Sequence, residues 1–150
     1  MQIYKKFFKK QNYMTKNFKL SEFLRSDTAS RYKIDNTPNK EQLDNLSFVA
    51  EQLEVIRSYY NKPILISSGF RTKELNTLLK GSKTSQHMQG LAVDINLKTK
   101  NENKIFFNLV NKLIQEKKIK VYQLIDEYNY KWVHIGFSQT NPKGQVLHLK

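Results

Sequence analysis

The sequence predicts an α+β fold in one domain, because helical and strand-like hydrophobic patterns alternate along its 150 residues. Residues 39–60 and 101–118 repeat apolar side chains with the 3.6-residue period of helices that bury one face. Residues 91–96 instead alternate between two faces, as a strand does. Residues 121–127 and 132–137 are two further strand-like runs, separated by a length that is ordinary for a hairpin loop.

Shorter elements connect these segments. Residues 21–24 begin a short helix with Ser21 as its expected N-cap. Residues 64–68 are a short apolar run typical of a buried strand, and residues 72–80 return to helical spacing. Arg71 therefore lies where a strand passes into a helix, at the end of a sheet, where functional sites commonly form.

Composition limits the classes of protein that the chain can belong to. The 26 Lys and Arg residues against 13 Asp and Glu give a formal charge of +13, which favours polyanionic partners such as nucleic acid, anionic lipid or cell-wall polymers. There is no cysteine, so a metal site must be built from imidazole and carboxylate groups. No apolar run approaches the roughly 20 residues that span a bilayer, and no transmembrane segment is expected.

We expect three segments: a basic N-terminal arm at residues 1–17, a domain at 18–137 and a weakly patterned tail at 138–150. The arm lacks the apolar core of a secretory signal, so no signal peptide is expected. It is interpreted as a solvated or loosely docked segment, with binding to a surface as the alternative.

The most informative residues are His87, Asp94 and His134, which use two of the chain's three histidines. Strand alternation places Asp94 and His134 opposite apolar faces, so both can point into one groove if their strands are neighbours. Two histidines and a carboxylate are a ligand set for catalytic zinc. The alternatives are a hydrogen-bonded core histidine, an exposed loop histidine, and an aspartate that caps a turn or pairs with a lysine.

These residues carry a resemblance to a known family. The pattern is Ser85-x-His87-x-x-Gly90-x-Ala92-x-Asp94 with a later Trp132-x-His134. It resembles the zinc D-Ala-D-Ala carboxypeptidase and murein endopeptidase family, within the LAS metallopeptidases, in the compact form found in phage lysins. Further matching motifs are Phe18-x-Leu20-x-Glu22-Phe23, Asp35-Asn36-x-Pro38, Ser68-Gly69-Phe70-Arg71, Leu75-Asn76 and Gln123-Leu124-Ile125.

The resemblance implies a LAS metallopeptidase-like fold, a small antiparallel sheet packed by helices, and one zinc ion per chain on His87, Asp94 and His134. It implies a hydrolase of bacterial peptidoglycan that cleaves a peptide stem or cross-link at a D-alanyl bond, as a phage endolysin or virion lysin. Such a protein is expected to be a monomer. It would reach the periplasm or cell wall from the host cytoplasm, or be delivered in a virion.

Attack by water on an amide needs a general base, and the same group then protonates the departing amine. Part of the family has an acid three residues before the final histidine, but this chain has Lys131 there. The resemblance favours Glu127, with Asp126 as the alternative. A hairpin centred between Tyr130 and Lys131 would place Glu127 opposite His134, and a one-residue shift would exchange the faces of the two acids.

Other residues have open roles. Arg71 is expected to anchor a substrate carboxylate or the developing oxyanion, or else to form an ordinary salt bridge. Ser85 is expected to contact the substrate or to fix the His87 loop, and Trp132 to form a groove wall or to pack.

Three functions follow from these observations. The first is a zinc-dependent peptidoglycan hydrolase whose basic surface favours anionic envelope polymers. The second is a catalytically silent module of the same fold that binds wall peptide. The third, a nucleic-acid binder, is disfavoured because no recognised nucleic-acid motif accompanies the charge.

Overall fold

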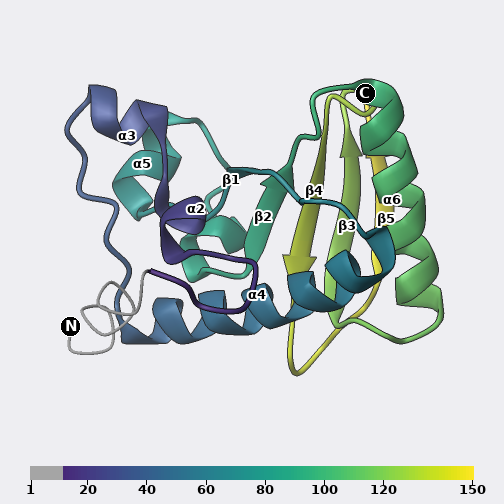
Figure 1. Ribbon diagram of the computed structural model, residues 1–150. Coiled ribbons are helices and arrows are strands. Elements are labelled where there is room, and N and C mark those ends of the chain that lie inside the picture. Colours follow the sequence, from purple (N-terminus) through teal and green to yellow (C-terminus); the bar gives the residue numbers. More distant parts are fainter. Residues whose placement is uncertain (1–11) are drawn as a thin grey trace.

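The computed structural model describes residues 12–150 (Figure 1). Most of the predicted basic arm, residues 1–11, lies outside the described part of the chain. The helices are α2 (Leu20–Leu24), α3 (Asp27–Arg31), α4 (Lys40–Tyr60), α5 (Lys73–Leu78), the 3₁₀ helix η1 (Gln86–Gln89) and α6 (Lys100–Gln115). The strands are β1 (Ile66–Ser68), β2 (Ala92–Ile95), β3 (Val121–Glu127), β4 (Trp132–Phe137) and β5 (Gln145–Leu149).

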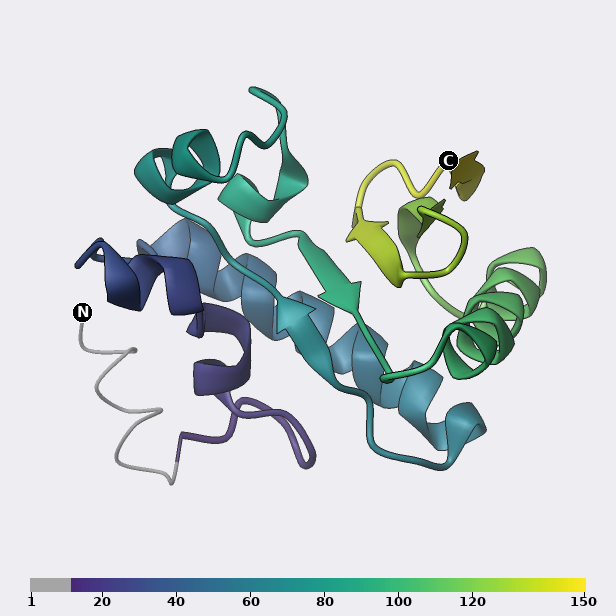
Figure 2. The same cartoon turned by 90° about the horizontal axis from the view of Figure 1, so that it is seen from above.

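The five strands form one sheet in the order β1-β2-β4-β3-β5. All neighbours are antiparallel except β3 and β5, which are parallel. Helices α2, α3 and α5 gather at the β1 end of the sheet, and α6 lies at the β5 end (Figures 1 and 2). The α+β fold predicted from the sequence is confirmed, and the predicted antiparallel sheet gains one parallel pair.

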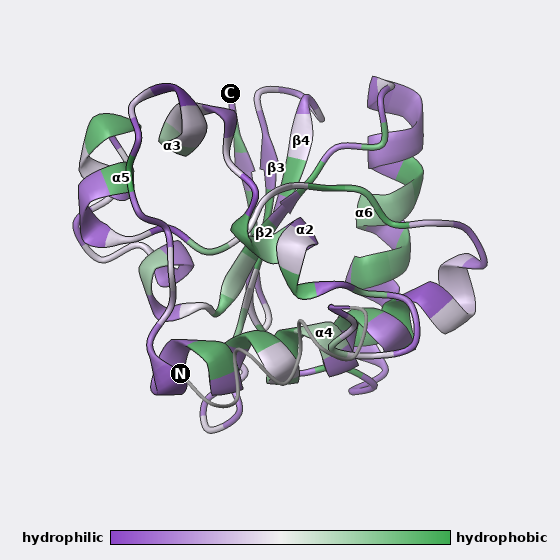
Figure 3. Ribbon diagram, turned by 60° about the vertical axis from the view of Figure 1, so that its left-hand side comes forward, coloured by the Kyte–Doolittle hydropathy of each residue, from purple (hydrophilic) through white to green (hydrophobic). Residues whose placement is uncertain are grey.

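The core lies between the sheet and its two long helices. Helix α4 runs beneath β1 and β2 (Figure 2), and α6 packs against β3, β4 and α4. Figure 3 shows green, hydrophobic residues concentrated on β2, α6 and part of α4. The fully buried side chains include Leu46, Leu53 and Ile56 of α4 and Phe106 and Val110 of α6. Burial of these stripes is the main force that holds the sheet in place.

Side chains at the ends of both long helices explain where they begin. Asn39 accepts a hydrogen bond from the Gln42 backbone (2.8 Å), and Gln42 Oε1 accepts one from the Asn39 backbone (2.8 Å). This reciprocal capping box satisfies two backbone donors of α4. Thr99 caps α6 by accepting from the Glu102 N–H at 3.1 Å. The predicted helices at 39–60 and 101–118 are confirmed to within a few residues.

The structure differs from the sequence prediction at the first helix. Helix α2 begins at Leu20, so Ser21 is not its N-cap. Glu22 instead accepts a hydrogen bond from the Lys19 backbone N–H at 2.7 Å. A carboxylate in the first turn of a helix satisfies a free backbone N–H, and its negative charge interacts favourably with the positive end of the helix dipole. The cap is therefore supplied from inside the helix.

The C-terminal segment adds an element that the sequence did not predict. Within residues 138–150, strand β5 pairs with β3 over five positions, from Gln123–Gln145 to Glu127–Leu149. Val146 packs on the core, but most of this edge strand is exposed or half-buried, so it lacks a clear hydrophobic period. This segment therefore forms part of the sheet.

Candidate metal centre

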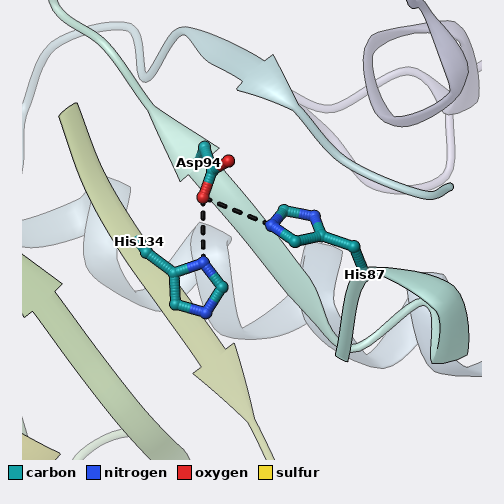
Figure 4. A group of neighbouring side chains, drawn as sticks. All are labelled: His87, Asp94 and His134. Atoms are coloured by element: carbon teal, nitrogen blue, oxygen red, sulfur yellow. Dashed lines mark hydrogen bonds and ion pairs between the residues drawn. The ribbon is translucent and has the colours of Figure 1, made fainter. Parts of the chain in front are cut away.

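Three elements bring His87, Asp94 and His134 together (Figure 4). Asp94 on β2 and His134 on β4 are direct cross-strand partners, and His87 approaches from η1. One ligand atom from each residue lies within 4.8 Å of the other two. The predicted neighbourhood of the two strands is thus confirmed, and the three side chains converge on one point.

The carbonyl of Gly69 determines the tautomer of His87. His87 Nδ1 lies 2.6 Å from the Gly69 oxygen, which can only accept a hydrogen bond, so Nδ1 carries the proton. In the neutral ring, Nε2 then has a lone pair, and it points towards the Asp94 Oδ1 atom at 3.3 Å. A carbonyl on the second ring nitrogen is the usual arrangement of a metal-binding histidine.

Asp94 is the centre of the cluster. Its Oδ1 atom lies 2.9 Å from His134 Nδ1 and 3.3 Å from His87 Nε2, while Oδ2 lies 3.4 Å from an Arg71 nitrogen. Burial acts to raise the pKa of Asp94, but the charges and hydrogen bonds of the two histidines outweigh it and hold the pKa well below its usual range. The carboxylate is therefore ionised and available as a ligand.

The donor set fits zinc. When the His87 ring is neutral with its proton on Nδ1, Nε2 and the Asp94 carboxylate are both acceptors, and a cation between them removes their repulsion. A proton or a metal ion can meet that need. Two imidazole nitrogens and one carboxylate oxygen are a familiar three-residue zinc set that keeps a further position open.

Arg71 follows β1, as predicted, and its backbone N–H donates to the His87 carbonyl at 3.1 Å. Its guanidinium donates to Ser68 (3.2 Å), Asn76 (3.4 Å) and Asp94 (3.4 Å). The salt bridge that was one alternative for this residue is therefore present. Since a guanidinium has five N–H donors, these three contacts leave two for a substrate in the groove that Arg71 lines.

Glu127 ends β3 on the same face as the cluster. The predicted pairing of Glu127 with His134 is wrong, because Glu127 pairs with Trp132 and Ile125 pairs with His134. The loop of residues 128–131 is flanked directly by the Glu127–Trp132 pair, so the partner of Glu127 lies two residues before the predicted one. Strand side chains alternate with a period of two, and Glu127 stays on the His134 face. Burial, and then the Asp94 charge, raise the pKa of Glu127 above its usual value of 4.5.

Asp126, the alternative base, faces away from the cluster. Its carboxylate accepts from the Tyr130 backbone N–H at 2.6 Å and contacts His148 Nδ1 at 3.0 Å. It is buried beneath the hairpin loop and does not line the groove around the cluster. Asp126 therefore holds the hairpin loop through hydrogen bonds, and Glu127 is the acid that shares the groove with the histidines.

A groove of about 930 Å³ contains the cluster. The predicted Ser85 and Trp132 both line it, and Ser85 Oγ also accepts from the His87 backbone N–H at 3.2 Å. Residues that received no role from the sequence also line it, and most carry hydroxyl, amide or amino groups: Lys80, Ser82, Thr84, Gln89, Tyr122, Ser138, Thr140 and Asn141. Their scattered positions give no motif, because they meet only in the fold.

Gln86 is another groove residue without a predicted role. Its Nε2 donates to the Phe137 carbonyl at 3.1 Å, which connects η1 to β4. A Cβ atom at Gly136 would lie 2.0 Å from Gln86 Oε1, so the glycine leaves room for the amide. Gln86 therefore helps to fix the position of His87 relative to His134.

Comparisons with known proteins agree with this geometry. A family model described as Peptidase M15 matches residues 16–136. This range contains the three clustered residues, Arg71 and Glu127. A comparison with curated proteins gave no match. In the part of the chain that the structure describes, no helix is both long enough and apolar enough to cross a membrane.

Proposed function

The chain belongs to the peptidase M15 family, whose members are zinc-dependent, and on that premise we propose that it is a zinc peptidoglycan hydrolase. The bond cleaved is a D-alanyl bond in a peptide stem or cross-link, as in D-alanyl carboxypeptidases and murein endopeptidases. The protein acts as a phage endolysin or virion lysin. The observation that carries the proposal is the convergence of His87, Asp94 and His134 on one point, with Glu127 in the same groove.

In this proposal His87, Asp94 and His134 hold the zinc ion. When bound, zinc activates water and polarises the scissile carbonyl as a Lewis acid. The chain's own contribution is to hold the His87 imidazole in position through the Gly69 carbonyl, and the Asp94 carboxylate through Arg71. Such outer contacts fix the direction of each ligand and are important for metal affinity.

Glu127 is the proposed general base and acid. Its carboxylate accepts the proton of the attacking water and gives it to the amine nitrogen that leaves. In the metal-free protein burial raises the pKa of this carboxyl, and a more basic carboxylate accepts the proton of water more readily. Arg71 donates its two further N–H groups to a substrate carboxylate or to the developing oxyanion.

The groove supports a peptide as the substrate. Hydroxyl and amide side chains along its walls can donate to and accept from a peptide backbone. A volume of about 930 Å³ is at the upper end of ordinary ligand sites, so it suits several residues of a stem or cross-link. The net charge of +13 supports association with anionic envelope polymers.

Purified cell-wall sacculi test the proposal directly. Zinc-loaded protein is incubated with sacculi, and the released muropeptides are identified by mass. We expect release by the wild-type protein, none with a chelator and none from His134→Ala. The product masses identify the bond, because loss of a terminal D-alanine and opening of a cross-link give different products.

The same assay separates the alternatives. A zinc-loaded wild-type protein that binds sacculi and releases nothing is the silent wall-binding module. Salt-dependent binding to DNA without binding to sacculi would instead support the nucleic-acid reading. Either result overturns the proposed hydrolase.

A further inference from the structure

The β3–β4 hairpin has an unusual loop beside the candidate centre. Tyr128, Asn129 and Tyr130 all have positive φ angles, of 52°, 55° and 62°. This left-handed conformation is uncommon for residues other than glycine, and it persists only where surrounding contacts enforce it. The loop joins Glu127 to Trp132, which are the last paired residues of the two strands.

Two buried side chains enforce this conformation. Asn103 of α6, which is 1% exposed, donates from Nδ2 to the carbonyls of Tyr130 (2.9 Å) and Lys131 (3.1 Å). Asp126 accepts from the Tyr130 N–H on the other side. These contacts fix the loop to α6. Glu127 and Trp132, which flank the loop and line the groove, are therefore held by a rigid hairpin end.

The Trp132 indole N–H donates to the Oε2 atom of Glu127. The exposed Tyr128 ring supports the indole from one side, with 5.2 Å between the ring centroids and an angle of 52° between the ring planes. A carboxylate side chain has several rotatable bonds, so a fixed donor on one oxygen limits the directions that the other oxygen can take. Trp132 also lies two residues before His134 on β4.

We propose that Trp132 is a positioning residue that holds Glu127 towards the candidate metal centre through its indole N–H. Its own contact is with the carboxylate, so the groove wall is a secondary role for the ring. The inference rests on the proposed function for the catalytic role of Glu127. The hydrogen bond itself can be measured without activity.

The chain has one tryptophan, so one indole N–H resonance reports on this contact. We expect this proton to resonate downfield in the metal-free wild-type protein and to move upfield in Glu127→Ala. In Tyr128→Leu, which removes the supporting ring and keeps the N–H donor, the resonance should move much less. An indole resonance that is the same in wild type and Glu127→Ala overturns the hydrogen bond.

Kinetics then test positioning. Trp132→Phe retains an aromatic ring and lacks the N–H donor, so kcat should fall by about 10-fold to 100-fold with little change in KM. Zinc content should stay at one per chain. In a Glu127→Gln background, the same Trp132→Phe change should have almost no further effect on kcat, because the oriented base is already gone.

Different results overturn the positioning role of Trp132 and the proposed hydrolase function. A rise in KM with unchanged kcat in Trp132→Phe would make Trp132 a substrate-binding wall and overturn the inference. An equal loss of kcat in both backgrounds would show that the indole acts independently of Glu127. If the zinc-loaded wild type releases no muropeptide, the proposed function fails, and the indole resonance still decides whether the contact exists.

Discussion

His87 Nδ1 lies 2.6 Å from the carbonyl oxygen of Gly69, and this contact selects the ring nitrogen that faces Asp94. The contact connects the end of β1 to the first residue of the candidate centre. A carbonyl cannot donate a hydrogen bond, so it excludes the other neutral tautomer of the ring. The main chain directly after β1 thus prepares Nε2 as a ligand.

Gly69→Ala should weaken zinc binding because a Cβ atom there would lie 2.5 Å from the Phe23 carbonyl oxygen. Backbone must move, and the Gly69 carbonyl moves with it. Disturbing the outer partner of a histidine ligand typically lowers metal affinity by about 10-fold to 100-fold. Zinc affinity can be measured by competition with a chelating dye.

Gly144→Ala is a matched control. Its Cβ would lie 2.8 Å from an Ile114 methyl group at a positive φ of 63°, so this variant is also strained. Gly144 is not among the residues that line the groove, and folded Gly144→Ala should bind zinc as the wild type does. Equal affinities in both alanine variants would contradict the role assigned to the Gly69 carbonyl.

Asp94→Asn should remove the stabilisation of the fold by zinc. The amide has nearly the same shape, but it lacks the charge that attracts the cation. At a zinc concentration about 100 times Kd, the wild-type free energy of unfolding should rise by about 2.7 kcal/mol. Asp94→Asn should show no such rise in a thermal or denaturant melt at the same zinc concentration.

Asp44→Asn controls for the loss of one negative charge. Asp44 pairs with Lys40 on the surface of α4, where both side chains are more than half exposed. Its zinc response should match the wild type, since exposed ion pairs contribute little. A wild-type zinc response in Asp94→Asn would exclude this carboxylate as a ligand.

The sequence predicts the helices and strands that carry this site better than it predicts the pairing and register of those strands. Periodicity identifies α4, α6 and the strands that carry Asp94 and His134, because each buries one clear face. The side on which Glu127 lies was also predicted, since alternation along a strand fixes the face. These features depend on local patterns that burial imposes.

Long-range contacts were harder to predict. Strand β5 is an exposed edge without strong periodicity, and its parallel pairing with β3 depends on the path of the chain. The hairpin register depends on three left-handed residues, none of them glycine, which Asn103 holds from α6. The Trp132–Glu127 contact follows from that register and therefore has no signal in the sequence alone.

The raised pKa of Glu127 predicts how stability depends on pH. Burial and the Asp94 charge favour the protonated form in the folded protein, so folding becomes less favourable as the pH rises from 4.5 through the raised pKa. Glutamine cannot ionise. Metal-free Glu127→Gln should therefore melt at a higher temperature than the wild type at pH 7, with a smaller difference at pH 4.

Differential scanning calorimetry in the presence of a chelator measures this comparison. Asp126→Asn serves as a reference, because Asp126 accepts hydrogen bonds in the loop and its replacement should not stabilise the protein. If the difference between wild type and Glu127→Gln is the same at both pH values, the carboxylate is not held in an unfavourable environment.

In the proposed mechanism Glu127 works beside a metal held by His87, Asp94 and His134. The most direct measurement is the turnover of muropeptide release by zinc-loaded Glu127→Gln and Asp126→Asn, with zinc content determined on the same samples. We expect Glu127→Gln to hold one zinc per chain and to lose about 100-fold to 10,000-fold in kcat. Asp126→Asn should keep both zinc and most of its turnover. Full turnover in Glu127→Gln would show that Glu127 is not the general base.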